Sequence, residues 1–383
     1  MSEIRWVADP ESLEALIGDL SAVDAYALDT EFLTERTYWP RLALLQVAWP
    51  AGIAVVDPFA VDIAPFGEVL GGAGTMVAHA ADQDLAILER SCGLGPTSLF
   101  DTQVAAGFCG HGTPSLAILV ERLLGTRLAK GDRLADWTHR PLSSGERAYA
   151  AADVEHLLAL HERLMADLDA SGRLAWALDE CDERRARDRT RQDADAAWWK
   201  LKGSRQLRGK ARGVAQLVAA WRERTAAAVD LPPRFVLPDL ALAGIVQRPP
   251  RTPEELQAVR GLDGRHLRGG ATAEILTAVE EGLSLDPSRL HLPDAAPIDR
   301  ALGSAVTVVA AWLTQRAAEL DLDPALLATR FDISLLLSGV ECRLSHGWRA
   351  DLVADPINRL VRGEAMLALT DGGRRLILED RHR

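Results

Sequence analysis

The feature that most constrains this chain is a short apolar segment that runs into two carboxylates. Residues 25–28 are apolar, as expected for a strand buried in a sheet, and Asp29 and Glu31 follow at once. Residues two apart on a strand lie on the same face, so both acids point the same way. Because a buried carboxylate is costly unless it is paired or binds a cation, the segment predicts either a strand end facing solvent or a site for a hard cation.

Two further acidic sites occur later in the chain. After an apolar segment at 76–78, Asp82 is suited to cap a helix, and Asp84 would lie in its first turn, either favouring the helix dipole or ligating a metal. Tyr149 and Asp153 are four residues apart on a predicted helix, with three alanines between them. That pair fits a core tyrosine beside a surface acid, or a ligand beside a hydroxyl that positions water.

Together these residues form a set that is far more specific than any one member. The set comprises Asp29, Glu31, Asp84, Asp153 and Tyr149. Hydrolysis of a phosphodiester by two metal ions needs several carboxylates, because they offset two dications crowded beside a phosphate. A phenol in the same place could orient or deprotonate the attacking water. The sequence therefore predicts a metal-dependent phosphodiesterase.

Composition limits the remaining classes. The chain has 383 residues, enough for two or three cores, and we expect no signal peptide and no membrane span. Its cysteines are scattered without a metal-ligand spacing, which predicts reduced thiols in the cytoplasm. The net charge of −12 disfavours a general nucleic-acid binder, but residues 184–212 carry eleven Lys or Arg against three Asp.

The order of predicted elements indicates an α/β domain followed by helical modules. We expect antiparallel strands at 25–29, 42–48 and 53–56, then parallel βα units at 76–78, 82–92, 98–100 and 102–109, and helices at 115–124 and 143–169. Beyond them, an Ala-Ala-Trp segment recurs after 91 residues, at Trp221 and Trp312, which predicts two helical repeats. The expected parts are an α/β domain at 1–190, a basic linker at 191–207, and helical domains at 208–287 and 297–383.

In these segments the chain resembles the ribonuclease D family, in the tyrosine-bearing subclass of DEDD 3′→5′ exonucleases. The matching stretches are Leu28–Phe32, Arg41–Gln46, His79–Ala80 with Asp84–Leu85, Asp101–Gln103, Lys130, Asp136–Trp137, Arg140–Leu142 and Tyr149–Val154. The C-terminal repeats resemble a pair of HRDC domains, which are small helical nucleic-acid-binding modules. The resemblance implies an α/β ribonuclease H-like domain with a mixed sheet, followed by two small all-α domains.

The resemblance also implies an activity and roles for the acidic set. Asp29, Glu31, Asp84 and Asp153 would bind two divalent ions, Mg²⁺ or Mn²⁺, and Tyr149 would position the water. The family trims the 3′ single-stranded ends of structured RNA such as tRNA precursors, releasing 5′-mononucleotides. We expect a cytoplasmic enzyme that acts on RNA without a membrane. The sequence does not determine the oligomeric state, for which a monomer is the working expectation.

Five residues are candidates for substrate contacts. Phe32 and Leu33 could wedge against the terminal base or belong to the core. Gln46, inside an apolar strand, needs a hydrogen-bond partner and could reach the substrate sugar. Lys130 and Arg140 could contact phosphates or be ordinary surface residues.

Other conspicuous residues have structural interpretations. We expect His79 to be a hydrogen-bonded core histidine and Asp101 to cap a helix. Tyr38 and Trp39 could bind RNA or pack a loop. Trp198 and Trp199, beside Lys200 and Lys202, could form a basic aromatic patch, but we expect them to pack between helices.

Two other functions remain open from the sequence. A DNA exonuclease of the proofreading or repair type would use the same carboxylates, and the absence of a polymerase or helicase segment favours RNA. A non-catalytic nucleic-acid adaptor would not need all four acids and the tyrosine. Removal of the chain after Gly209 is expected to weaken binding of structured RNA and to spare cleavage of short oligonucleotides.

Overall fold

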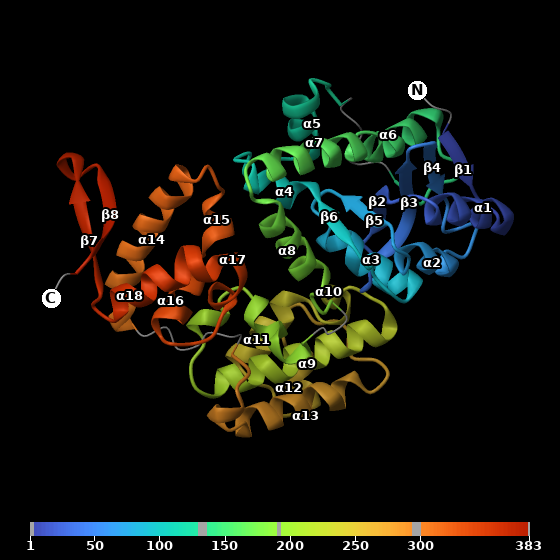
Figure 1. Cartoon of the computed structure of the whole chain (residues 1–383). Helices are drawn as coiled ribbons and strands as arrows, with labels where there is room; N and C mark the ends of the chain where they lie inside the picture. Colours follow the sequence, from blue (N-terminus) through green and yellow to red (C-terminus); the bar gives the residue numbers. More distant parts are fainter. Residues whose placement is uncertain (1–3, 129–135, 190–192, 293–299, 382–383) are drawn as a thin grey trace. The chain divides into compact units, whose positions relative to one another are not determined.

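The protein divides into two compact units (Figure 1). The computed structural model describes residues 4–128, 136–189, 193–292 and 300–381. One unit contains Met1–Glu31, Leu42–Arg187 and Ala296–Arg383, and the other contains Phe32–Arg41 and Asp188–Ala295. In the described residues, no helix is both long and apolar enough to cross a membrane.

The first unit is built on a mixed sheet. Its strands in the described residues are β1 (Ile4–Val7), β2 (Ala25–Leu33), β3 (Arg41–Trp49), β4 (Gly52–Val56), β5 (Thr75–Ala78) and β6 (Leu99–Asp101). Their order across the sheet is β1-β4-β3-β2-β5-β6. Strand β3 runs antiparallel to β4, whereas β5 runs parallel to both β2 and β6, as the sequence predicts.

Two features of this sheet differ from the prediction. Strand β1 was not predicted, because Arg5 and Trp6 interrupt the apolar pattern of a segment only four residues long; it lies at the sheet edge, parallel to β4. Strand β2 continues to Leu33 instead of ending at Asp29, so both acids lie within the strand. Strand β3 is buried from Leu42 onward, as expected for a strand covered on both faces.

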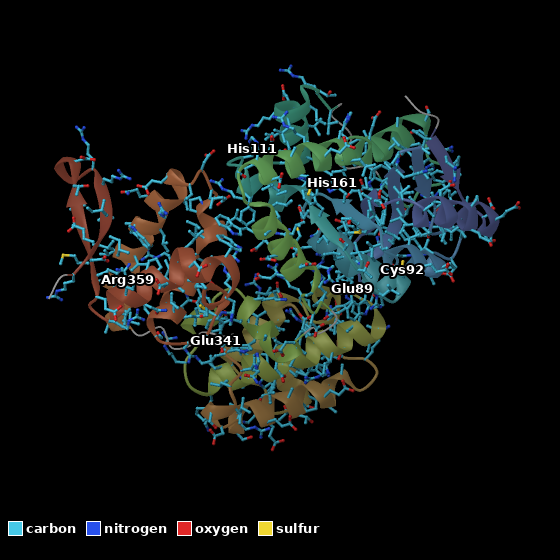
Figure 2. The ribbon with its side chains drawn as sticks, in the orientation of Figure 1. Glu89, Cys92, His111, His161, Glu341 and Arg359 are labelled. Carbon is cyan, nitrogen blue, oxygen red and sulfur yellow. The ribbon has the colours of Figure 1, made fainter. Side chains whose placement is uncertain are left out.

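Helices flank this sheet. They are α1 (Pro10–Ser21), α2 (Gly67–Leu70), α3 (Asp82–Cys92), α4 (Thr102–Phe108), α5 (Leu116–Leu124), α6 (Ser144–Glu155), α7 (Leu157–Ala170) and α8 (Leu174–Arg185). The predicted helix 143–169 is in fact two helices that break at His156. The sequence conceals this break because the apolar spacing continues through Val154, Leu157 and Leu160, all buried. Helix α7 contributes His161, which Figure 2 labels. Its ring meets the Phe100 ring edge-on, with the ring centroids 4.6 Å apart.

A C-terminal module belongs to the same unit. Its elements are α14 (Gly303–Glu319), α15 (Pro324–Leu327), α16 (Arg330–Leu337), α17 (Gly347–Arg349), α18 (Asp355–Val361), β7 (Ala365–Thr370) and β8 (Arg375–Asp380). Trp348 stacks on Trp176 of α8 at 5.3 Å and meets Phe108 of α4 edge-on at 5.2 Å. One continuous hydrophobic core therefore joins the module to the helices beside the sheet.

The sequence suggested that the C-terminal module is all-α, but this prediction is wrong. Strands β7 and β8 form an antiparallel hairpin, paired from Ala365 with Asp380 to Thr370 with Arg375. The turn contains Gly372 and Gly373, both with positive φ, which a glycine adopts at little cost. The strands are short and partly exposed, so their alternation is a weak sequence signal.

The second unit is helical. Its longer helices are α9 (Lys210–Val229), α11 (Asp239–Gln247) and α13 (Ala271–Ser284), joined by the short α10 (Pro233–Val236) and α12 (Pro253–Gln257). A Cβ on Gly213 of α9 would lie 2.3 Å from the carbonyl oxygen of Gly282, so glycine permits the close approach of α9 and α13. Trp198 is fully buried and its indole donates to the His291 carbonyl at 2.9 Å, which confirms a packing role.

The loop between β2 and β3 belongs to this helical unit. The backbone N–H groups of Tyr38 and Trp39 both donate to the Asp230 carboxylate at 3.1 Å. The Tyr38 hydroxyl donates to Glu223 at 3.0 Å. Of the two interpretations of this aromatic pair, the structure supports packing of a loop.

Candidate active site

The first part of the site is the second half of strand β2. Asp29 and Glu31 are partly buried, so they keep some contact with solvent. Thr30 lies between them in the strand, and only 5% of it is exposed. The strand therefore contributes two partly buried carboxylates with a buried hydroxyl between them in the sequence.

The second part is the first turn of helix α3. Ala81 occupies the N-cap position and Asp82 begins the helix, so the predicted N-cap role of Asp82 is wrong. Asp82 instead pairs with Arg184 at 3.5 Å. Asp84 is buried, with 6% exposed, and its Oδ1 accepts a 2.5 Å hydrogen bond from the Thr30 hydroxyl. This bond ties α3 to the strand that carries the other two acids.

The third part is helix α6, which holds Tyr149 and Asp153 on one face. The helix starts at a capping box, in which Ser143 and Glu146 satisfy each other's backbone N–H groups. The Tyr149 ring stacks on Trp137, with centroids 6.0 Å apart and planes 19° apart. Trp137 therefore limits the orientations that the phenol can take.

Electrostatic coupling indicates that Asp29 and Glu31 lie near Asp84 and Asp153. Burial, followed by the charges of Asp84, Asp153 and Glu31, raises the pKa of Asp29 well above its usual value. Burial and then the charges of Asp153 and Asp84 raise the pKa of Glu31 to about 7. Burial raises the pKa of both Asp84 and Asp153 to about 6. Burial is the largest cause of all four shifts. The charges of neighbouring carboxylates add to it at Asp29 and Glu31, and the charge of Asp101 adds to it at Asp84, because like charges in a poorly solvated place disfavour ionisation.

The donor set fits divalent cations. All four side chains offer oxygen, the donor that Mg²⁺ and Mn²⁺ prefer, and the charged groups that shift their pKa values are all carboxylates. Within the described part of the chain, no three His, Cys, Asp or Glu side chains converge closely enough to form a ready coordination shell. The fit therefore rests on donor chemistry and on uncompensated negative charge, which a dication would neutralise.

The predicted substrate contacts have different surroundings. Phe32 and Leu33 continue β2 directly after Glu31 and are partly buried. Gln46 is fully buried on β3, and neither polar atom of its amide has a hydrogen-bond partner. Its side chain is not exposed to a substrate in this conformation. Lys130 lies outside the described residues.

Arg140 has a structural role instead of the predicted phosphate contact. Its Nε and one Nη bind both oxygens of the buried Asp57, at 2.6 and 2.8 Å. Its other hydrogen bonds reach the carbonyls of Trp137, His139 and Ala43. These bonds use all five N–H groups of the guanidinium, so we do not retain Arg140 as a phosphate ligand.

Several further residues support the site, and two of them had no local sequence signal. Thr30 and Trp137 are defined by contacts with residues far away in the sequence. Asp101 caps α4 as predicted, but its carboxylate also binds the turn before α3. His79 is hydrogen-bonded to Thr102 and to the Pro114 carbonyl, which confirms it as a core histidine.

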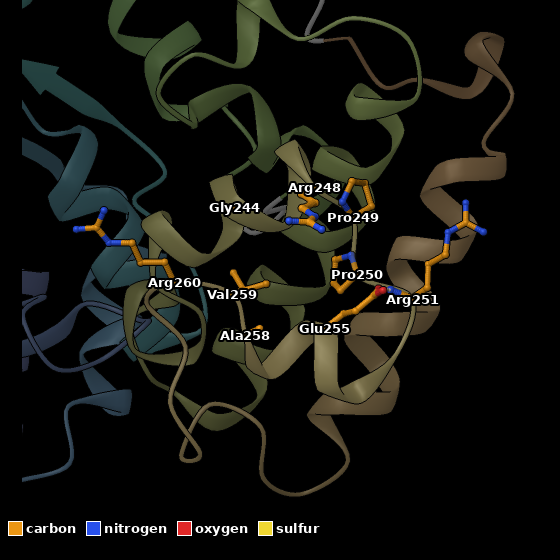
Figure 3. Close-up of a pocket in the computed structure, with 9 residues that line it drawn as sticks. All are labelled: Gly244, Arg248, Pro249, Pro250, Arg251, Glu255, Ala258, Val259 and Arg260. Atoms are coloured by element: carbon orange, nitrogen blue, oxygen red, sulfur yellow. Dashed lines mark hydrogen bonds between the residues drawn. The ribbon is translucent and has the colours of Figure 1, made fainter.

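The helical unit contains a pocket with basic residues. Figure 3 shows Arg251 and Arg260 on opposite sides of this pocket, with Arg248 between them. The three arginines are exposed, and the lining also includes Pro249 and Pro250. Three positive charges spaced over one surface suit a polyanion such as a nucleic-acid backbone.

Comparison with known proteins finds two family models along the chain. A family model described as 3′-5′ exonuclease matches residues 4–169, and the HRDC domain model matches residues 211–279. The ribonuclease D of Acidiphilium cryptum is 34% identical over 380 residues, covering 97% of this chain and 95% of the relative. The Escherichia coli ribonuclease D is 32% identical over 371 residues, covering 94% of this chain and 98% of the relative.

A solved structure agrees with these sequence matches. The crystal structure of Escherichia coli RNase D, described as an exoribonuclease involved in structured RNA processing, aligns with a TM-score of 0.83. The alignment has 30% sequence identity and covers 94% of this chain and 99% of the other. The predicted α/β exonuclease domain with a mixed sheet and the first of the two predicted HRDC domains are confirmed.

Proposed function

The chain belongs to the ribonuclease D family and is a 3′→5′ exoribonuclease, and on this basis we propose that Asp29, Glu31, Asp84 and Asp153 are its metal ligands. The exonuclease family depends on divalent metal ions. We propose two of them, Mg²⁺ or Mn²⁺, because four mutually repelling carboxylates carry more negative charge than one dication offsets. When bound, the ions supply an activated water and stabilise the leaving oxygen.

The protein residues orient the reactants. Tyr149 places its hydroxyl one helical turn from Asp153, where it would hold the attacking water in line with the terminal phosphodiester. Trp137 stacks on the Tyr149 ring and restricts its motion, so the hydroxyl is oriented before the substrate binds. Phe32 and Leu33 follow Glu31 on the same strand. Phe32 would stack on the terminal base and Leu33 would wedge against it, contacts that tolerate any sequence.

We propose that the substrates are structured RNAs with single-stranded 3′ ends, such as tRNA precursors, which are shortened by one 5′-mononucleotide at a time. The HRDC match and the arginines around Pro249 support RNA binding by the helical unit. DNA is the alternative substrate, because the carboxylates act on the phosphodiester and do not distinguish the sugars. A proposed location in the cytoplasm is supported by the free Cys92, Cys109, Cys181 and Cys342. A monomer remains the expectation for the oligomeric state.

The observation that carries this proposal is the coupling of the four carboxylates. It is tested by digestion of a 3′-extended tRNA labelled at its 5′ end, with Mg²⁺, with Mn²⁺ and with chelator. We expect a metal-dependent ladder that shortens from the 3′ end and is absent with Asp29→Ala. The same ladder on single-stranded DNA at a higher rate would replace RNA by DNA as the substrate. No cleavage with either metal would overturn the assignment of the acids.

A further inference from the structure

Helix α3 begins at a turn that is held by a carboxylate from another strand. Asp101, at the end of β6, is completely buried. Its Oδ1 accepts the backbone N–H of Ala80 at 3.0 Å, and its Oδ2 accepts that of Ala81 at 2.9 Å. Two consecutive amides are thus bound by two different oxygens of one side chain, which fixes the direction of the chain as it enters the helix.

This turn is strained without its partner. Ala80 has a φ of +61°, in the left-handed region that an alanine seldom adopts. Such a conformation is unfavourable for a residue with a Cβ and persists only where surrounding contacts enforce it. Ala81 then accepts the first hydrogen bond of α3, from Leu85 at 2.9 Å. The placement of the first turn of α3 therefore depends on Asp101.

Capping of α4 does not explain all the contacts of Asp101. The cap uses Oδ1, which accepts from Gln103 at 2.9 Å and from Val104 at 3.4 Å. Oδ2 has no part in this cap, and it binds Ala81 and the guanidinium of Arg184, the latter at 2.9 Å. If Asp101 served only to cap α4, its Oδ2 would not need to bind Ala81 and Arg184.

Asp84 lies in the first turn of α3, whose placement depends on Asp101. The Asp84 side chain is held separately by Thr30 of strand β2. The Thr30 hydroxyl donates directly to the Asp84 carboxylate. Thr30 is buried and lies between two of the proposed metal ligands on β2, so the bond sets the distance between Asp84 and that strand. The Asp84 carboxylate is thus located both by its backbone and by its own oxygen.

We propose that Asp101 and Thr30 are positioning residues that prearrange Asp84 for metal binding, Asp101 through the Ala80–Ala81 turn and Thr30 directly. The inference rests on the proposed function, in which Asp84 is a metal ligand. Residues that orient a ligand without touching the metal commonly change metal affinity or activity by about 10- to 100-fold when they are substituted. Asp101 and Thr30 therefore tune the affinity of the site for its cation, beyond any contribution to folding.

The test measures Mn²⁺ binding to the full-length, RNA-free protein by electron paramagnetic resonance, together with the thermal unfolding midpoint. Asp101→Asn replaces one acceptor oxygen by a donor that faces other donors. We expect it to weaken Mn²⁺ binding about 10- to 100-fold. Thr30→Val removes the hydroxyl while keeping the side-chain shape and should act in the same direction, whereas Thr30→Ser should restore binding.

A matched control separates positioning from stability. Asp332 of the C-terminal module is also a buried carboxylate at the start of a helix, where it completes the capping box of α16 and pairs with Arg343. Asp332→Asn should lower the unfolding midpoint and leave Mn²⁺ binding unchanged. In the double variant Thr30→Val with Asp101→Asn, the loss of affinity should be smaller than the product of the two single effects, because both act on one carboxylate.

The outcomes distinguish this inference from the proposed function. Asp84→Asn should weaken Mn²⁺ binding at least as much as Asp101→Asn. If Asp84→Asn weakens binding while Asp101→Asn and Thr30→Val do not, the positioning proposal is wrong and the ligand assignment stands. If Asp84→Asn itself leaves binding unchanged, the assignment of Asp84 as a ligand fails. If Asp101→Asn does not fold, the Mn²⁺ affinities of Thr30→Val and Thr30→Ser are compared. Equal affinities of these two variants would contradict positioning of Asp84 by the Thr30 hydroxyl.

Discussion

The guanidinium of Arg349, in the C-terminal module, donates to the carboxylate of Glu180 on helix α8, and both side chains are buried. Arg349 also donates to the Leu326 carbonyl at 2.8 Å and lies 4.4 Å from the ring centroid of Trp348. The ion pair lies beside the stacked Trp176 and Trp348. The C-terminal module and the exonuclease helices are therefore held together by one core and one buried charge pair.

Arg349→Met should destabilise the protein by about 3–5 kcal/mol, because it leaves the Glu180 carboxylate buried without its partner. The double variant with Glu180→Met should regain much of that loss, since no charge is then stranded. Thermal and urea unfolding of the two variants measure this effect. Arg127→Gln, which breaks an exposed pair with Glu121, is the control and should change stability by less than about 1 kcal/mol. Equal effects of Arg349→Met and Arg127→Gln would contradict the prediction.

The same packing changes what truncation should do. Removal of the chain after Gly209 takes away Trp348 and exposes Trp176 and Phe108, which it covers. Cleavage of short oligonucleotides should therefore fall with the fraction of folded enzyme, contrary to the expectation from sequence. Circular dichroism of the truncated chain beside its activity measures both quantities. A truncated protein that is fully folded and fully active would show that the shared core is dispensable.

The acidic cluster predicts an unusual dependence of stability on pH. In the folded protein the pKa of Asp29 is raised well above its usual value. The pKa of Glu31 is raised to about 7, and the pKa values of Asp84 and Asp153 are raised to about 6. The folded protein therefore holds more protons than the unfolded chain between about pH 4 and pH 7. Through these groups, the metal-free protein should lose stability as the pH rises across that window.

Asp29→Asn removes one charge from this cluster. In chelator at pH 8 the variant should be more stable than the wild type, because burial and the neighbouring carboxylates that raise the pKa of Asp29 also make its ionised form destabilise the fold. The difference should shrink at pH 5, where the wild-type acids are protonated, and Mg²⁺ at pH 8 should stabilise only the wild type strongly. Unfolding midpoints at the two pH values give the result. A variant less stable than wild type at pH 8 in chelator would contradict mutual repulsion.

The parts of the site that the sequence predicts are those set by local periodicity. Asp29 and Glu31 share a face because a strand has a period of two, and Tyr149 and Asp153 share one because a helix has a period near 3.6. The mixed sheet followed from the short links around β3 and from the later βα units. Each of these inferences needs only residues that are close in the sequence.

The parts that were missed or misassigned depend on distant residues. Thr30 meets Asp84 across 54 positions, and Arg140 meets Asp57 across 83 positions. An arginine in a loop gives no local sign of whether its guanidinium faces a phosphate or a buried carboxylate. The attachment of the C-terminal module to α8 is equally invisible, because Arg349 and Glu180 are 169 positions apart.

The arginine pocket predicts how the enzyme holds the body of an RNA. Replacement of Arg248, Arg251 and Arg260 by glutamine should weaken binding of a 3′-extended tRNA and leave cleavage of short oligonucleotides unchanged. Each lost phosphate contact should reduce the slope of log affinity against log salt by about 0.7–0.9. Titrations at several salt concentrations measure this slope. A triple variant of Arg5, Arg127 and Arg163, which form exposed ion pairs, has the same change in net charge and should bind normally. Equal weakening by both triple variants would indicate only a general effect of charge.

Tyr149→Phe tests the orientation of the attacking water. The variant keeps the ring that stacks on Trp137 and removes only the hydroxyl. Turnover should fall by about 10²-fold or more, within the range for a group that handles a proton in the transition state, while KM changes little. The matched control is Tyr26→Phe, because the Tyr26 hydroxyl is buried without a hydrogen-bond partner, so its removal should leave both turnover and stability intact. Single-turnover cleavage at saturating enzyme separates chemistry from product release. If Tyr149→Phe and Tyr26→Phe both cleave at the wild-type rate, the hydroxyl of Tyr149 has no part in the reaction, and the water must be oriented by the carboxylates alone.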